Sequence, residues 1–444
     1  MHNLKVIHVL AYSGILTLGM LSFVFSKKEK ESILEKRKLQ ENPTITLKSF
    51  LDGSWMLKYE KFMDDHFPWR SSFVDIAFQL NELKGIKNPN NARLITKTKD
   101  KKIDEKKIDL NKAARDINYL INAESASSKG LLIIAGRAFQ VFGGTRASVK
   151  SYVDVVNEYR KILPDHVRVF NCIVPTGSSF IFVKEYDYLR DKEFKNIDDA
   201  YSFSSPNVIN VPAKDAIVAH QDEYIYFASD HHWTARGAYY AYTAYCQASG
   251  LKATPLNKMT RKVKRNFLGT LYNLTKDESI KKNIDSVEYF IPSVSTDVKV
   301  FAEFASGGNS YGVFLGGDKA HLKIKTSVKN GKSVVVIKNS FGNPFSTFLI
   351  NNYETVHVVD YRYFDSGLLR LIKNEEIDDV IFFHNVFSAN TLSHSERQRI
   401  IKNPVSTENS SEKKTNEKKM ETKKTNKNSK LELNDENSDS DTTN

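Results

Sequence analysis

Residues 226–238 read YFASDHHWTARGA and place an acid, two histidines and a tryptophan in succession where a strand-like run ends. A carboxylate two residues from an imidazole, at a strand-to-helix corner, can fix the tautomer of the ring and stabilise its charged form. Asp230 and His232 therefore fit two members of a nucleophile-activating triad. The third member should be a Ser or Cys elsewhere in the chain.

The residues that follow predict a helix. The stretch 238–247 is rich in Ala and Tyr, with Thr234 placed as its N-cap and Gly250 as its stop. Its tyrosines could stack on sugars, but at helical spacing they fit a buried core better.

The best candidate nucleophile follows a second apolar run. Residues 334–337 (VVVI) predict a buried strand, which leads through a tight corner at Ser340 to a helix opened by Pro344. At the start of a helix, free backbone N–H groups can hold an oxyanion. Gly342 allows a close backbone approach and Asn343 offers an amide donor, although Ser340 could also serve only as a helix cap.

Short apolar runs alternate with helical patterns through the middle of the chain. Near-continuous apolar strands separated by helices indicate an α/β fold with helices on both faces of the sheet. Ligands of such sheets bind beyond the carboxyl ends of the strands. The expected strands are 131–135, 167–174, 334–337, 355–359 and 380–383, and further expected helices are 107–123 and 149–163.

The N-terminus contains a long apolar run. Residues 6–26 are mostly apolar and long enough to cross about 30 Å of hydrocarbon. The run lacks the small-residue exit of a cleaved signal peptide, so we expect a retained transmembrane signal-anchor behind a cytoplasmic tail at 1–5.

Two arguments about orientation conflict. The lysines and arginines that follow the span favour a cytoplasmic body by the positive-inside rule. The very short tail instead matches an anchor that translocates everything after it, and long domains cross largely regardless of charge. We predict a single pass through the cytoplasmic membrane, with the body facing the periplasm or the cell exterior.

Composition divides the rest into a stalk at 27–49, a catalytic domain at 50–403 and a tail at 404–444. The tail has almost no apolar residues and is predicted to be disordered. Its lysine-rich and acidic parts nearly cancel, so the net charge of +12 belongs to the body and stalk. A basic body suits an anionic polymer or lipid, and no nucleic-acid motif accompanies it.

The chain has two cysteines, Cys172 and Cys246, and no CxxC pair. Two buried thiols or one disulfide both fit this pattern. Asp230, His231 and His232 could instead bind a metal together with a distant acid such as Asp318 or Asp360. They lack the i, i+4 spacing of a helical histidine pair, so we predict no metal and no cofactor.

These stretches resemble a known family. The string Asp230-His231-His232-Trp233, followed by Thr-x-x-Gly-Ala, is the signature of the DHHW family, which is similar to the SGNH-hydrolase group of alginate and peptidoglycan O-acetyltransferases. The resemblance covers residues 50–389. It includes the motifs DHFPWR (65–70), VPT (174–176), HxxExIY (220–226), FLGGD (314–318), NSFGN (339–343) and VDYRYF (359–364).

The resemblance implies an SGNH-like sheet and a Ser-His-Asp triad. Ser340 becomes the nucleophile, His232 the base and Asp230 the residue that orients it, while His231 is expected to point away from the triad. The Gly and Asn blocks that form the oxyanion hole of ordinary SGNH esterases have no secure match here. Asn343, Gly342, Gly316 and Gly317 are candidates for it.

The implied function is O-acyl transfer, of acetyl, to an exported polysaccharide. A multi-pass acyltransferase is the donor partner that the resemblance implies. A carbohydrate acetylesterase would use the same triad with water in place of the sugar hydroxyl. A non-catalytic glycan-binding or scaffold subunit that keeps the fold is a third interpretation. The sequence identifies neither the polysaccharide nor the oligomeric state.

Overall fold

The computed structural model describes residues 2–26, 28, 31–32, 37–68, 93–95, 109–117, 119–120 and 128–405. Almost all of the predicted tail (406–444) and much of the predicted stalk lie outside this set. Of the expected helix at 107–123, the described part forms α5 (Leu110–Ala113) and is then broken by a turn at 114–115.

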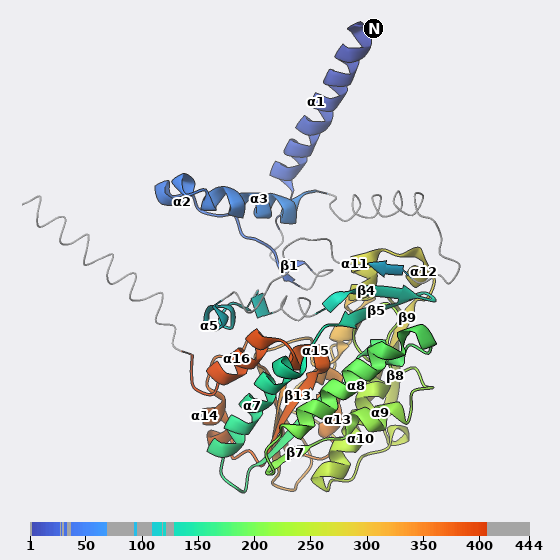
Figure 1. The fold of residues 1–444 in the computed structure, drawn as a ribbon, viewed down its shortest axis with the longest axis vertical. Coiled ribbons are helices and arrows are strands. Elements are labelled where there is room, and N and C mark those ends of the chain that lie inside the picture. Colours follow the sequence, from blue (N-terminus) through green and yellow to red (C-terminus); the bar gives the residue numbers. More distant parts are fainter. Residues whose placement is uncertain are drawn as a thin grey trace, which may run out of the picture.

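A six-stranded sheet forms the centre of the body (Figure 1). Its strand order is β10-β12-β11-β13-β6-β7, and every pairing is parallel except that of the edge strand β10 with β12. The α/β class is therefore confirmed. The strands are β6 (Arg168–Val174), β7 (Val208–Asn210), β10 (His321–Lys325), β11 (Ser333–Lys338), β12 (Thr355–Asp360) and β13 (Asp379–Asn385).

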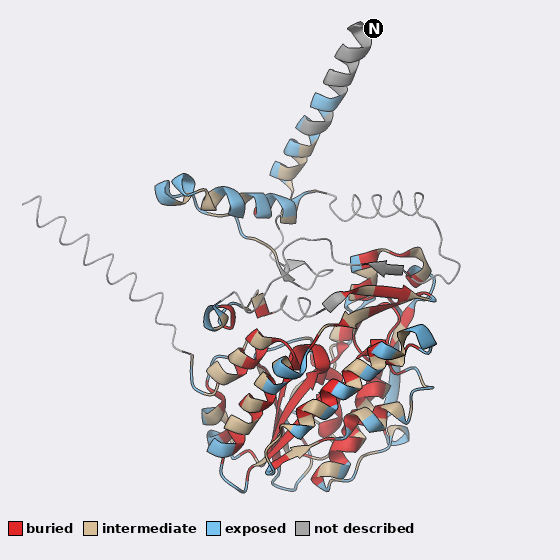
Figure 2. Cartoon of the chain, viewed as in Figure 1, coloured by how far each residue is buried: buried red, intermediate tan, exposed pale blue. Residues whose placement is uncertain are grey.

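Helices cover both faces of this sheet, because alternate side chains of the buried strands point to opposite sides. Val334 and Val336 of β11 pack on the face covered by α9 (Ala213–Val218), α10 (Ala235–Ser249) and α13 (Gly342–Leu349). Val335 and Ile337 pack on the opposite face. That face is covered by α7 (Arg146–Ile162), α8 (Asp187–Ser202), α14 (Leu368–Asn374) and α15 (Val386–Ala389), and α16 (Leu392–Ile400) packs against α7. Figure 2 shows the buried residues concentrated between these layers.

Two smaller sheets flank the body. The apolar run at 131–135 falls mostly within β4 (Ser128–Ile134), which pairs antiparallel with β3 (Arg93–Ile95) and β5 (Arg137–Phe142). The expectation that this strand belongs to the main sheet was wrong. A short apolar run predicts a buried strand but does not indicate which sheet the strand joins. The second pair is β8 (Thr260–Phe267) with β9 (Asp285–Ile291), and α11 (Thr270–Thr275) and α12 (Glu278–Lys281) lie between them in the chain.

The N-terminal segment contains α1 (His2–Phe25), α2 (Leu47–Leu51) and α3 (Ser54–His66). The short pair β1 (Glu31–Ser32) and β2 (Arg37–Lys38) lies between α1 and α2 in the chain. Within the described residues, no helix combines the length and the apolarity needed to cross a membrane. The transmembrane assignment of residues 6–26 stays a prediction.

Both cysteines are free and buried, so the structure contains two thiols and no disulfide between them. Cys172 lies in β6 and Cys246 in α10. Burial raises the pKa of Cys246 to about 12, which keeps it protonated and unreactive near neutral pH.

Candidate active site

The loop that carries the acid and the two histidines is closed by backbone pairing. Tyr226 and Trp233 form an isolated antiparallel bridge, and the amide of Phe227 donates to the carbonyl of His232 at 3.3 Å. Asp230, His231 and His232 are thereby held at the tip of a tight loop. The predicted helix α10 follows directly.

The cap of α10 fixes the direction in which the chain leaves this loop. The Thr234 hydroxyl accepts from the amides of Arg236 and Gly237, and Gly250 ends the helix in the left-handed conformation. Both predicted helix signals are confirmed.

Ser340 lies two residues beyond the end of β11, at the carboxyl edge of the sheet. The corner is tight: a Cβ atom added to Gly342 would lie 2.4 Å from the Cβ of Lys338, so only glycine fits there. The indole of Trp233 donates to the carbonyl of Phe341 at 3.0 Å. This bond ties the histidine loop to the serine corner across more than 100 residues of sequence.

The structure brings Asp230, His232 and Ser340 into one hydrogen-bonded chain. Oδ1 of Asp230 lies 2.5 Å from Nδ1 of His232, and Nε2 of His232 lies 2.7 Å from Oγ of Ser340. With the proton on Nδ1 facing the carboxylate, Nε2 accepts from the serine hydroxyl. Asp230 and His232 are buried, whereas Ser340 is partly exposed. This is the geometry in which a base activates a serine.

The second oxygen of Asp230 is held from α11. The backbone amide and the hydroxyl of Thr270 donate to Oδ2 at 2.7 and 2.9 Å, while the backbone amide of His232 donates to Oδ1 at 3.0 Å. A Cβ atom on Gly269 would lie 2.2 Å from the Cβ of Asp230, so glycine is required for this approach. Four donors therefore fix the carboxylate and compensate for its burial.

A second buried carboxylate holds the strand that leads into the loop. Asp285, at the start of β9, accepts from the backbone amides of Ala228 (2.9 Å) and Ser229 (2.7 Å) and from the hydroxyls of Ser229 and Tyr224. The hydroxyl of Ser229 in turn accepts from the amide of Gly269 at 3.0 Å. The loop and the start of α11 are thus fixed as one unit.

Two rings enclose the imidazole of His232. Tyr311, from the 3₁₀ turn at Gly307–Val313, stacks on one face with centroids 3.9 Å apart and planes 14° apart. His231 lies at the same centroid distance and is tilted by 36°. The expectation that His231 points away from the triad was wrong, because the tight loop folds the two adjacent rings together.

Tyr311 also contacts the serine corner, since its hydroxyl donates to the carbonyl of Ser340 at 3.1 Å. Burial first, and then the nearby Asp230 carboxylate, raises the pKa of this phenol well above its ordinary value. The ring beside His232 therefore stays neutral at any working pH.

A small cleft, partly open to solvent, lies beside the two histidines. One wall is the turn after β6, which Glu193 of α8 holds by accepting from the amide of Thr176 (2.7 Å) and the hydroxyl of Ser178 (2.5 Å). Burial raises the pKa of Glu193, although these hydrogen bonds oppose the shift. The lining residues are Ala138, Phe139, Gln140, Thr176, Gly177, Ser178, Tyr226, Phe227, Asp230, His231, His232 and Leu271.

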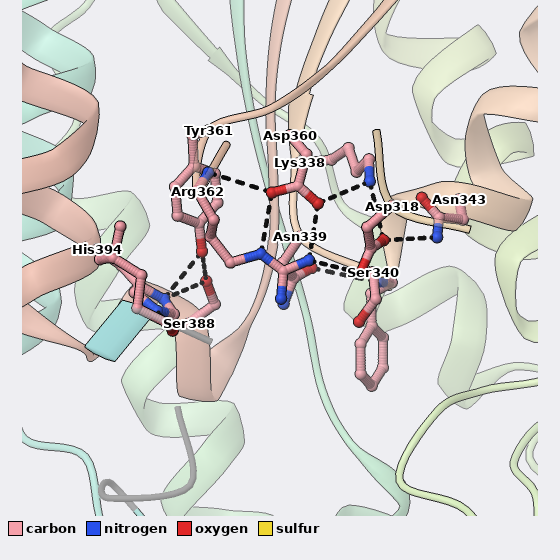
Figure 3. Close-up of polar contacts among 12 residues, drawn as sticks. Asp318, Lys338, Asn339, Ser340, Asn343, Asp360, Tyr361, Arg362, Ser388 and His394 are labelled. Atoms are coloured by element: carbon pink, nitrogen blue, oxygen red, sulfur yellow. Dashed lines mark hydrogen bonds and ion pairs between the residues drawn. The ribbon is translucent and has the colours of Figure 1, made fainter. Parts of the chain in front are cut away.

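A network of charges, of which Lys338, Asp360 and Arg362 are buried, fixes the strand ends next to Ser340 (Figure 3). Lys338 of β11 lies 2.9 Å from Asp360 and 3.1 Å from Asp318, and Arg362 reaches the same two carboxylates at 2.7 and 2.8 Å. Burial opposes ionisation of Asp318, but the two cations outweigh it and hold its pKa well below the usual range.

Three of the four oxyanion candidates donate hydrogen bonds to groups other than Ser340. The amide nitrogen of Asn343 donates to Asp318 at 2.9 Å, as Figure 3 shows, and the backbone amide of Gly342 donates to the carbonyl of Asn339 at 3.0 Å. Gly316 and Gly317 form a turn with positive φ, in which the amide of Gly317 donates to Phe314. Asn343, Gly342 and Gly317 are thus engaged in shaping the corner and the turn.

The predicted metal alternative has a partial basis in the geometry. Asp230, His231 and His232 each offer a ligand atom, and these atoms lie within 4.8 Å of one another. The proposed distant ligands, Asp318 and Asp360, are instead paired with Lys338 and Arg362. Both nitrogens of His232 also face hydrogen-bond partners, so the donor set fits a hydrogen-bonded triad better than a metal site.

Comparison with known families identifies the chain. The model of the DHHW family, described as DHHW protein, matches residues 104–359, more than half of the sequence. The chain belongs to the DHHW family. Its Asp230–Trp233 string lies inside the matched region.

A solved structure of another DHHW protein, from Eubacterium siraeum, is 30% identical with a TM-score of 0.57. The match covers 62% of this chain and 96% of that one. PatB1 of Bacillus cereus is 17% identical, with 58% and 96% covered and a TM-score of 0.49. The O-acetyltransferase domain of AlgJ from Pseudomonas putida is 13% identical, with 55% and 82% covered and a TM-score of 0.29. No curated protein matches the sequence.

Proposed function

We propose that this DHHW protein is a serine-dependent O-acyltransferase that carries an acyl group, acetyl in the first instance, to a hydroxyl of an exported polysaccharide. The observation that supports the proposal is the continuous Asp230–His232–Ser340 hydrogen-bond chain with its partly exposed serine. The choice of acetyl and of a polysaccharide comes from the family resemblance described above.

The first half-reaction forms an acyl-serine. Oγ of Ser340 attacks the carbonyl carbon of the acyl donor while Nε2 of His232 takes the hydroxyl proton. Asp230 holds the imidazolium, and its bonds to Thr270 leave both carboxylate oxygens in place throughout. Collapse of the tetrahedral intermediate breaks the bond to the leaving group, which receives the proton from His232.

The second half-reaction reverses the roles. A sugar hydroxyl enters, gives its proton to His232 and attacks the acyl carbon, and the proton then returns to Ser340 as the new ester leaves. The acceptor would approach from the exposed side of Ser340, and the small cleft beside His231 and His232 is the neighbouring space that one of its groups could enter. Water in the same position would give hydrolysis, so the identity of the acceptor decides between transfer and esterase activity.

The membrane anchor and its orientation are proposed from the sequence alone. We place residues 6–26 as an anchor, the body outside the cytoplasmic membrane, and a multi-pass acyltransferase as the source of the acyl group. Alkaline phosphatase fused behind Asn444 tests the orientation. It should be active, whereas activity confined to a cytoplasmic reporter would contradict an exported substrate.

The test of the chemistry uses p-nitrophenyl acetate as donor with and without an oligosaccharide acceptor. Purified full-length protein should release nitrophenol, and a transferase should also form acetylated oligosaccharide. The variant Ser340→Ala should do neither. Release of nitrophenol without any acetylated product, over a panel of oligosaccharides, would favour the esterase.

A further inference from the structure

Outside α1, the exposed apolar side chains of the described residues are concentrated in one short segment. Eight large apolar side chains between 45 and 67 are exposed, against nine over the whole of 128–405. Surfaces in water carry such side chains mostly scattered, as the body does. A dense group of them marks a surface that contacts an apolar phase.

The group follows helical spacing. Leu47, Phe50 and Leu51 of α2 lie at i, i+3 and i+4, which places them on one face of the helix, and they are 79%, 50% and 75% exposed. The capping box between Thr46 and Ser49 holds this turn as a helix. Nothing in the described chain covers these three apolar side chains. In water alone they would therefore contribute little to the stability of the fold.

The group continues into α3. Met56, Leu57 and Met63 are 57%, 70% and 39% exposed. The helix is tied to the chain before α2, because the indole of Trp55 donates to the carbonyl of Pro43 at 3.0 Å, and Trp55 also stacks on Tyr59 within α3. These contacts hold α3 in place while its remaining apolar side chains stay outside.

The two helices lie end to end across the foot of α1 (Figure 1), and Figure 2 shows them as mostly exposed. Phe23, near the end of α1, packs edge-on against Phe62 of α3 with centroids 5.8 Å apart. The apolar side chains of α2 and α3 therefore continue the exposed apolar surface of α1, which includes Leu21, Val24 and Phe25.

We infer that α2 and α3 form an interfacial platform, residues 45–63, that lies flat on the lipid bilayer. Exposed lysines at 48, 58 and 61 alternate with its apolar side chains, which is the composition of helices that lie in the headgroup region. A protein partner would need an apolar groove of its own. A bilayer is the occupant that continuity with the apolar end of α1 favours.

This inference rests on the proposed membrane location but does not need α1 to span the bilayer, and it is independent of the triad. The platform would keep the N-terminal end of the body at the membrane. Acyl donors and glycan chains that emerge at the membrane surface would then be close to the protein.

The test places an environment-sensitive fluorophore on the full-length protein through Leu51→Cys, with Phe304→Cys as the matched control. Phe304 is 86% exposed on the body, and both native cysteines are buried and unreactive. The labelled proteins are reconstituted into vesicles of phosphatidylcholine and phosphatidylglycerol, with and without lipids that carry a quencher. Flotation and p-nitrophenyl acetate turnover are measured on the same samples.

The fluorophore at position 51 should show a blue-shifted emission and strong quenching by the lipid-borne quencher, while the one at 304 stays water-like. A water-like signal at 51 in floating protein would overturn the platform and leave the anchor intact. A blue shift without lipid quenching would show that protein covers the face and would also overturn it. Protein that does not float with the vesicles would overturn both the platform and the membrane anchor. If p-nitrophenyl acetate turnover is unchanged in the same samples, the catalytic triad is intact and only the membrane part of the account has failed.

Discussion

In the part of the chain that the structure describes, Ser340 and Ser388 each lie beside a histidine near the carboxyl edge of the main sheet, and only Ser340 has the surroundings of a nucleophile. Ser340 lies 2.7 Å from a histidine nitrogen, and Ser388 lies 3.2 Å from Nδ1 of His394. Ser388 and His394 are buried, at 1% and 0% exposure, whereas Ser340 is partly exposed. Figure 3 shows both serines, on either side of the charge network.

The far nitrogen of each histidine shows the second difference. His232 turns its other nitrogen to the carboxylate of Asp230, which can hold a positive charge on the ring. His394 turns Nε2 to the backbone carbonyl of Leu120 at 2.8 Å, and the hydroxyl of Tyr361 lies 2.8 Å from its Nδ1. The carbonyl of Leu120 and the hydroxyl of Tyr361 are both uncharged, so neither can balance a positive charge on His394. These contacts are typical of a packed core.

A serine beside a histidine is therefore not a functional signal on its own. Two features distinguish Ser340 from Ser388: its histidine is hydrogen-bonded to the carboxylate of Asp230, and its own side chain is partly exposed to solvent. Both differences can be tested by substitution.

Ser340→Ala and His232→Ala should each abolish ester turnover, with a loss of roughly 10³–10⁶-fold, because members of a triad act as a unit. The measurement is nitrophenol release by purified protein, with circular dichroism to show that the fold is kept. A Ser340→Ala variant that turns over at the wild-type rate would show that the assignment is wrong.

Asp230→Asn should lower the rate by up to roughly 10⁴-fold, since an amide favours the wrong tautomer of His232. The bonds from Thr270 should survive in part because the amide oxygen still accepts. A matched control is Asp222→Asn in the loop that precedes this strand, which should leave kcat/KM unchanged. Equal losses in both variants would point to damage of the fold rather than to the triad.

Tyr311→Leu removes the ring that stacks on His232 and should slow acylation. A ring face beside an imidazolium contributes about 0.5–2 kcal/mol, which corresponds to roughly 2- to 30-fold in rate. Tyr311→Phe keeps the ring and loses only the bond to the carbonyl of Ser340, so it should retain more activity than Tyr311→Leu. Identical rates for the two variants would contradict a role for the stack.

Acid should destabilise the fold through the buried His384, which lies beside Ser388. Burial lowers the pKa of His384 to about 3, although the hydrogen bond that its Nε2 donates to the amide oxygen of Gln398 opposes the shift. Between roughly pH 6.5 and pH 3 the unfolded chain takes up a proton that the folded chain excludes, so stability is full above this window and falls as pH is lowered. The loss reaches the order of a few kcal/mol. His384→Gln should flatten the dependence of Tm on pH, and His220→Gln at the surface should not.

Ser388→Ala should leave ester turnover within about twofold of wild type, while the loss of its buried hydrogen bonds costs about 1–3 kcal/mol of stability. Thermal unfolding and kcat/KM on the same preparation measure both effects. A loss of turnover comparable to that of Ser340→Ala, in protein that remains folded, would erase the distinction between the two pairs.

Local signals in the sequence were enough to place much of the fold. Thr234 and Gly250 bound α10 because caps depend on neighbouring residues, and the apolar runs of β6, β11, β12 and β13 are buried on both faces as their composition predicts. The run in β4 has the same composition but belongs to another sheet. Strand pairing is decided by distant residues, so the run itself carries no information about it.

The site shows the same limit. The spacing of Asp230 and His232 and the corner at Ser340 are visible in the sequence, and the structure brings the three together. Thr270 and Tyr311 could not be found in this way, because they reach the site from 40 and about 80 residues away and neither lies inside one of the recognised motifs. Asn343 is an oxyanion candidate from its position alone, and that role stays a prediction. Its hydrogen bond to Asp318, which also pairs with Lys338 and Arg362, could not be predicted from the sequence, because these residues are far apart in the chain.

The central claim is that Ser340 alone, of the two paired serines, is a nucleophile. A sulfonyl fluoride, which reacts with activated serine hydroxyls, tests it most directly when the full-length protein is labelled and then mapped by peptide mass spectrometry. We expect one adduct per chain, on Ser340, that disappears in Ser340→Ala and in His232→Ala and persists in Ser388→Ala. An adduct on Ser388, or equal labelling of Ser340 in the His232→Ala variant, would contradict the account.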